Sequence, residues 1–118
     1  MINIYAVTYT ALESLGYPVR EQGTYAPNET LPEAFVTYQI IDSPNNSAAD
    51  NLPTSQTTRV QVNLYSRDPD IKQGADGLLK SVMLPAGFLR AGGRDLPFSL
   101  QTGHYGYTCD YRYYMDLR

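Results

Sequence analysis

His104 and Cys109 are the two side chains that could form a catalytic pair, with a histidine base activating a thiol nucleophile. Each residue type occurs once in the sequence. The two are five positions apart in a segment with the alternation of a β-strand, so their side chains are expected on opposite faces. The sequence therefore predicts no pair between them, and it predicts that Cys109 is a buried, unreactive thiol on an apolar face.

Three carboxylates, Asp68, Asp70 and Asp76, lie near the expected start of a helix. Capping and solvation explain acids at this position better than ion binding or acid catalysis. The sequence contains no HExxH, paired CxxC, P-loop lysine or GxGxxG motif. We therefore expect no metal, no cofactor and no enzymatic activity.

Eleven tyrosines without a tryptophan could form a stacking platform for nucleic acid. Few basic residues are interleaved with them, however, and twelve acidic against nine basic residues give a formal net charge of -3. Long-range attraction to nucleic acid or to an anionic membrane is therefore not expected. Core packing, with hydroxyls reaching the rim, is the favoured role of the tyrosines.

The composition is that of one small soluble domain, residues 1–118. Hydrophobic residues make up 42% of the 118 residues and charged residues 18%, a balance typical of globular proteins. The N-terminal sequence has neither a basic segment nor a long apolar core, so we expect no signal peptide and no membrane anchor.

The elements that must position these residues begin with residues 104–117, where apolar and polar side chains alternate. This period of two predicts a strand about twice the usual length of ~5 to 6 residues, with one apolar face. The apolar set is Tyr105, Tyr107, Cys109, Tyr111, Tyr113, Met115 and Leu117.

Two amphipathic helices are predicted from apolar residues at helical spacing, at residues 2–15 and 69–84. Gly16 and Pro18 end the first helix. The apolar stripe of that helix is Ile4, Val7, Ala11 and Leu15, widened by Tyr5 and Leu12.

Alternation also predicts antiparallel strands at residues 35–42 and 58–66. Two short strands are expected at 88–91 and 96–101, separated by a turn at Gly92 and Gly93. Residues 18–32 are expected to form an extended connector.

Residues 43–57 have almost no large apolar side chain and are rich in Asn, Ser, Asp and Pro. We expect a long mobile loop, which is either a flexible hairpin tip or a functional segment that becomes ordered on assembly. The candidate assembly residues in it are Asn45, Asn46, Asp50 and Asn51.

Together these elements predict an α+β fold, a two-layer sandwich in which two helices cover one face of a mainly antiparallel sheet of about four strands. The core residues predicted between the second helix and the sheet are Val62, Leu64, Leu79, Val82, Tyr111 and Tyr113. The other sheet face is left for solvent or a neighbouring subunit. The side chains assigned to that face are Arg59, Gln61, Asn63, Tyr65, Asp110, Arg112, Tyr114 and Asp116.

The sequence resembles the tail terminator and tail completion proteins of long-tailed bacteriophages and prophages over nearly its whole length. The resemblance rests on the order of elements, the Leu-Pro-x-x-Phe-Val-x-Tyr entry to the first strand at 31–38, the polar loop, the Val-x-Val-x-Leu-Tyr-Ser strand at 60–66 with the helix that follows it, and the tyrosine-rich last strand.

This resemblance implies a non-enzymatic virion protein that forms a hexameric ring in the neck region of the tail. The ring would cap the tail tube and contact the tail tube protein and the head–tail connectors, after synthesis in the host cytoplasm. DNA would pass through its central hole without sequence-specific binding, and no membrane would be involved.

The rival interpretation is a monomeric or dimeric binding domain, for a small ligand or a host protein, that uses the same uncovered sheet face. In the ring interpretation, subunits associate through that face and its edges, because aromatic residues and arginine are enriched at interfaces. Cross-strand ion pairs on a solvated face are the competing explanation for these charges. The candidate interface residues are Arg59, Tyr65, Arg67, Asp110, Arg112, Tyr114 and Asp116.

Overall fold

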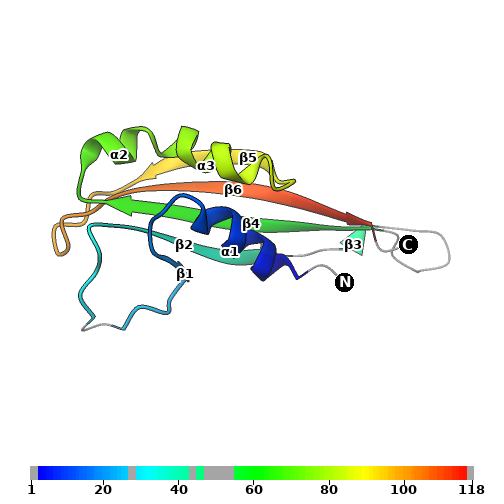
Figure 1. The fold of residues 1–118 in the computed structure, drawn as a ribbon, viewed down its shortest axis with the longest axis horizontal. Coiled ribbons are helices and arrows are strands. Elements are labelled where there is room, and N and C mark those ends of the chain that lie inside the picture. Colours follow the sequence, from blue (N-terminus) through cyan, green and yellow to red (C-terminus); the bar gives the residue numbers. More distant parts are fainter. Residues whose placement is uncertain (1–2, 27–28, 43–44, 47–54, 117–118) are drawn as a thin grey trace.

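The computed structural model describes residues 3–26, 29–42, 45–46 and 55–116. These residues form three helices and the strands of one sheet (Figure 1). The elements are α1 Ile4–Glu13, β1 Val19–Glu21, β2 Ala34–Asp42, β3 Asn45–Asn46, β4 Ser55–Ser66, α2 Pro69–Gln73, α3 Ala75–Met83, β5 Leu89–Leu96 and β6 Tyr105–Asp116.

The sheet has the strand order β1-β2-β4-β6-β5, with the short β3 paired to β4 outside this path. All pairings are antiparallel except that of β1 with β2. The predicted α+β class and mainly antiparallel sheet are therefore confirmed. The sheet is wider than predicted, because the connector after α1 contains the edge strand β1.

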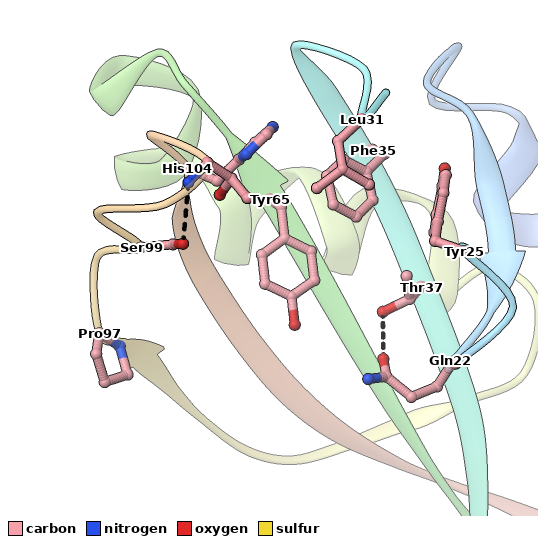
Figure 2. Close-up of a pocket in the computed structure, with 11 residues that line it drawn as sticks. Gln22, Tyr25, Leu31, Phe35, Thr37, Tyr65, Pro97, Ser99 and His104 are labelled. Carbon is pink, nitrogen blue, oxygen red and sulfur yellow. Dashed lines mark hydrogen bonds between the residues drawn. The ribbon is translucent and has the colours of Figure 1, made fainter. Parts of the chain in front are cut away.

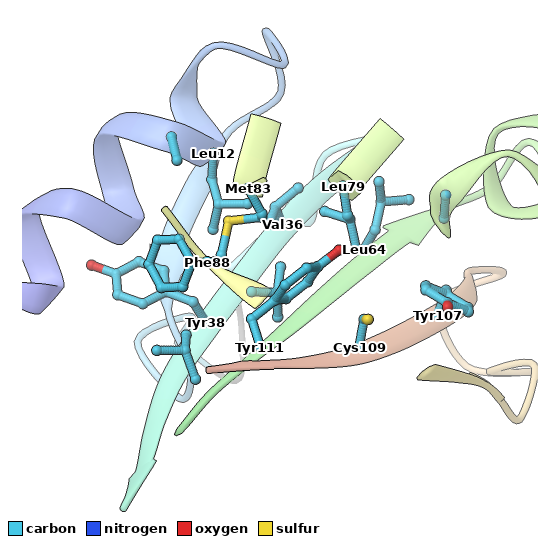
Figure 3. Packing of buried hydrophobic residues seen from close by; sticks show 14 residues of the cluster. Leu12, Val36, Tyr38, Leu64, Leu79, Met83, Phe88, Tyr107, Cys109 and Tyr111 are labelled. Atoms are coloured by element: carbon cyan, nitrogen blue, oxygen red, sulfur yellow. The ribbon is translucent and has the colours of Figure 1, made fainter. Parts of the chain in front are cut away.

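The helices pack on one face of the sheet, where they cover the side chains of β2, β4 and β6 (Figure 3). Four of the predicted core residues, Val62, Leu64, Leu79 and Tyr111, are fully buried. Val82 and Tyr113 were also predicted there and are only half-buried, at the margin of the same cluster.

The first helix begins and ends close to the predicted positions. Asn3 caps α1 by accepting hydrogen bonds from the backbone N–H groups of Tyr5 and Ala6, and Gly16 has a positive φ of 86° just beyond its end. Tyr5 was placed on the apolar stripe, but it is exposed. Thr8 is buried instead, with its hydroxyl donating to Ile4 O.

The second helix was predicted as one element and is two, α2 and α3, which meet at Gly74. This glycine has φ -90° and ψ 4°, and its N–H bonds to Asp70 O and Lys72 O, so the helical turn is interrupted there. The capping role of Asp68 is confirmed, because its carboxylate accepts a hydrogen bond from Asp70 N at 2.9 Å.

The predicted turn at Gly92 and Gly93 is wrong. Both glycines lie inside the continuous strand β5, which has a bulge between Arg90 and Gly92. An added Cβ at Gly93 would lie 2.7 Å from Tyr107 Cζ, so this glycine allows a close side-chain approach within the sheet. Residues 97–101, predicted as strand, are not part of one.

The loop predicted at 43–57 ends earlier than expected, because the next strand starts inside this range. β4 begins at Ser55, and Asn45 and Asn46 form β3 by pairing with Gln56 and Ser55. The proposed mobility of the rest, with Asp50 and Asn51, concerns positions outside the described residues and stays a prediction.

Within the described residues, no helix is long and apolar enough to cross a membrane.

Candidate functional site

The sheet face opposite the helices carries the candidate functional surface, and it is divided into two halves. The register aligns Phe35 with Tyr65, and Thr37 with Asn63 and Thr108, on this face. Asn63 is only 4% exposed and Thr108 only 2%. This part, the covered half, is therefore not the solvated surface that the sequence predicted.

Two connectors, residues 22–26 with 29–33 and residues 97–104, close over the covered half. His104 Nε2 lies 2.8 Å from Pro32 O and joins them. Arg67 makes a second link, since its Nε donates to Thr102 O at 2.9 Å and its Nη1 contacts Glu33 Oε1 at 2.6 Å. Within the chain Arg67 therefore holds these connectors together, and its place at a subunit interface stays a prediction.

The connectors and the sheet enclose a hollow of about 310 Å³, which we call the aromatic pocket (Figure 2). Its rings are close together: Phe35 stacks on Tyr65 at 4.9 Å between centroids, and Tyr25 and His104 pack against Phe35 at 5.1 and 5.2 Å. Burial raises the pKa of Tyr65 and that of Tyr25 above the ordinary value, so both phenols are neutral at physiological pH.

An ion pair fixes the Tyr25 wall of the aromatic pocket. The Arg20 guanidinium lies 4.2 Å from the centre of the Tyr25 ring and contacts Glu29 Oε2 at 2.8 Å. The hydrogen bond from Arg20, with a second from Ala26 N, lowers the pKa of Glu29. The connector is therefore held in place by charge as well as by apolar packing.

The polar wall of the pocket is a small hydrogen-bond network. Gln22 Oε1 accepts from the Thr37 hydroxyl at 2.7 Å and from Asn63 Nδ2 at 3.2 Å. Asn63 Nδ2 also donates to Thr37 Oγ1 at 3.1 Å. Because this network satisfies the Asn63 side-chain amide, Asn63 can be buried on a face that was predicted to be solvent-exposed.

The other part of this face, the open half, does match the predicted exposure. Tyr114 is 58% exposed, and Arg112, two residues before it on β6, is exposed as well. The register places Arg112 between Arg59 on β4 and Leu89 on β5, and Leu89 is 67% exposed. We call Arg59, Leu89, Arg112 and Tyr114 the assembly patch.

The predicted interface charges are partly paired within the chain. Arg59 Nη2 lies 3.8 Å from Asp110 Oδ2, a cross-strand pair of the kind expected on a solvated sheet. Arg112 makes no ion pair with any described residue. It sits directly opposite Arg59, which carries the same charge. Asp116, the last residue of β6, is exposed beside the patch.

A second polar cluster lies on the helix side. Asp76 accepts hydrogen bonds from Arg90 Nε and from the Tyr107 hydroxyl, both at 2.9 Å, and Lys80 Nζ is 3.5 Å away. Burial acts to raise the pKa of Asp76, but the bonds from Arg90 and Tyr107 outweigh it and the pKa is lowered. A carboxylate held ionised in this way joins α3 to the sheet and is a poor proton donor.

The predicted lack of a Cys–His pair agrees with the geometry. His104 lies in the covered half, whereas Cys109 is buried on the helix side, where burial raises the pKa of its thiol. In the described part of the chain no three His, Cys, Asp or Glu side chains are grouped so that they could hold a metal ion.

Sequence reasoning missed the aromatic pocket, although one signal for it was present. Phe35 is two residues from Thr37, and Tyr65 is two residues from Asn63, so each aromatic ring lies on the same sheet face as these polar side chains. Two opposed aromatic rings on such a face indicate that something covers them.

In the comparisons with known proteins, no family model matches this sequence, and no curated protein matches it.

Proposed function

We propose that this chain is a structural subunit of a bacteriophage tail, a tail terminator or tail completion protein without enzymatic activity. Six copies form a ring that caps the tail tube in the neck region of the virion. The ring contacts the tail tube protein on one side and the head–tail connectors on the other. DNA crosses the central hole as cargo, without sequence-specific binding.

The observation that carries the proposal is the assembly patch. It places the exposed side chains of Leu89, Arg112 and Tyr114, with the partly exposed Arg59, on neighbouring strands at one end of the sheet face. Large exposed apolar side chains beside arginine are the composition of interface hot spots. The helices cannot cover this patch, because they occupy the other face of the sheet.

Charge supports the same contact. Arg59 and Arg112 face each other across β4 and β6, an arrangement of like charges that is unfavourable in an isolated sheet. Asp110 compensates Arg59, and a carboxylate of an adjacent subunit would compensate Arg112. Acidic residues outnumber basic ones in the chain, twelve to nine, so each subunit can supply such a group.

The second candidate function is a non-enzymatic binding domain that acts as a monomer or dimer, for a small ligand or a host protein. The aromatic pocket favours it, because a mixed aromatic and polar hollow is typical of ligand sites. Oligomeric state separates the two functions.

Sedimentation velocity over a range of protein concentrations tests the ring. The wild type is expected to form a hexamer, and the double variant Arg59→Glu with Tyr114→Ala is expected to sediment as a monomer with unchanged circular dichroism. Tyr5→Ala is the matched control, because Tyr5 is an exposed tyrosine on α1, in the helical layer. It should leave the hexamer intact.

A wild type that stays monomeric at high concentration would contradict self-association through the patch. Electron microscopy of purified tail tubes mixed with the protein then tests the remaining claim, that the tube induces the ring. Tube ends that stay uncapped would exclude the tail-terminator function.

A further inference from the structure

The aromatic pocket has an apolar wall and a polar wall, and none of its lining residues belongs to the assembly patch. Figure 2 shows Leu31 and Phe35 on one side of it, and the hydroxyls of Tyr65 and Thr37 with the Gln22 amide on another. A ligand that fills this hollow must therefore be apolar over most of its surface and polar at one end.

The walls are held in place by contacts within the subunit. Phe35 and His104 are almost fully buried, and the Tyr65 ring is fixed by its stacking on Phe35, with 23° between the ring planes. A pocket that needs no rearrangement loses little affinity to the ordering of its side chains.

The polar wall offers hydrogen bonds that the subunit does not use itself. Gln22 Oε1 is occupied by Thr37 and Asn63, which fixes the orientation of the amide. Gln22 Nε2 and the Tyr65 hydroxyl make no hydrogen bond to the described residues. One amide donor and one hydroxyl are therefore free for a ligand atom that both accepts and donates.

We propose that the aromatic pocket binds a phenol, with the ring against Phe35, Tyr65 and Leu31 and the hydroxyl directed to Gln22 Nε2 and Tyr65. The volume of about 310 Å³ suits a single substituted ring. The phenol comes either from a free small molecule or from a tyrosine side chain of another copy of this chain. The site lies within one subunit, so the inference does not depend on the ring.

Titration of the protein with p-cresol, followed by NMR, tests the site. Saturable shifts are expected for the Gln22 side-chain amide and for the rings of Phe35 and Tyr65. Toluene is the matched probe without a hydroxyl, and p-cresol is expected to bind roughly tenfold more tightly, as one to two unshared hydrogen bonds allow.

Variants separate the contributions of the two walls. Tyr65→Phe keeps the ring and removes the hydroxyl, so it should narrow the difference in affinity between p-cresol and toluene. Tyr65→Ala should abolish saturable binding of both probes, whereas Tyr5→Ala, which removes an exposed tyrosine on α1 outside the pocket and the assembly patch, should change neither.

Sedimentation with saturating p-cresol identifies the source of the phenol. Dissociation of the assembled protein would assign the natural occupant to a tyrosine of a neighbouring copy, and an unchanged assembly would assign it to a free ligand. The proposal is overturned if toluene binds as tightly as p-cresol, if Tyr65→Phe retains the full difference, or if the shifts do not saturate.

Discussion

The ring of Tyr107 on β6 lies directly over Gly93 on β5, and this contact places the Tyr107 hydroxyl 2.9 Å from Asp76 Oδ1 on α3. A side chain at position 93 would occupy the space of the ring. Gly93 thus leaves room for the Tyr107 ring, whose hydroxyl reaches the Asp76 cluster that holds α3 on the sheet.

Gly93→Ala is expected to destabilise the protein by about 1 to 3 kcal/mol, as overpacking of a close contact does. The added methyl group would overlap Tyr107 and Thr108 O. Thermal and urea unfolding measure the change.

Gly77→Ala is the matched control for this substitution. Gly77 lies in α3 with no atom within 4 Å of an added Cβ, so alanine should raise the free energy of unfolding by up to about 1 kcal/mol. Equal effects of the two alanines would show that the Tyr107–Gly93 contact is not tight.

Leu79→Ala should lower the free energy of unfolding by about 2 to 5 kcal/mol, because Leu79 is fully buried between α3 and the sheet. Leu84→Ala, at the exposed end of the same helix, should cost much less. Urea titration of the two variants side by side makes the comparison. If Leu84→Ala lowered the free energy of unfolding as much as Leu79→Ala, the orientation of α3 on the sheet would be contradicted.

Asp76→Asn is expected to lower stability at pH 7 by an amount that shrinks in acid. The pKa of Asp76 is lowered in the folded protein, so its contribution is fully present above the ordinary value of 3.8 and is lost as the pH falls through the lowered pKa. Thermal midpoints of both proteins between pH 7 and pH 2 measure this convergence.

Asp95→Asn serves as the control for the carboxylate cluster, since Asp95 is exposed on β5 and its one ion pair among the described residues is with Lys72. Its effect at pH 7 should be smaller than that of Asp76→Asn. A difference between wild type and Asp76→Asn that stays constant down to pH 2 would refute the role of the charge.

Cys109 should resist thiol reagents in the folded protein. The thiol is fully buried and burial raises its pKa, so the reactive thiolate is scarce on both counts. Reaction with a chromogenic disulfide should be slow in native buffer and fast in denaturant. Rapid modification of native protein would show that the β4–β6 region opens readily.

Sequence reasoning succeeded where the signal is local. The alternation in β6 and the helical spacing and stop signals of α1 depend on neighbouring residues, and both elements were predicted to within about two residues of their ends. The four fully buried residues of the predicted core follow from the same periodicities.

It failed where the structure depends on distant partners. The three residues of β1 have no pattern of their own and become a strand only beside Val36 to Tyr38. Gly93 has the local character of a turn, and only Tyr107 shows why it lies in a strand. The pocket walls come from two connectors that share no periodicity, so their meeting through His104 and Pro32 could not be predicted.

The position of β6 has a consequence for how the chain folds. The strand that is synthesised last among those described lies between β4 and β5 in the sheet, and Ser55 pairs with Asp116. Among the described strands, β5 therefore has no partner until β6 has been made and has inserted between β4 and β5. Sheet formation is thus completed only by the last of the described strands, and its non-local pairings should place refolding in the range of about milliseconds to seconds.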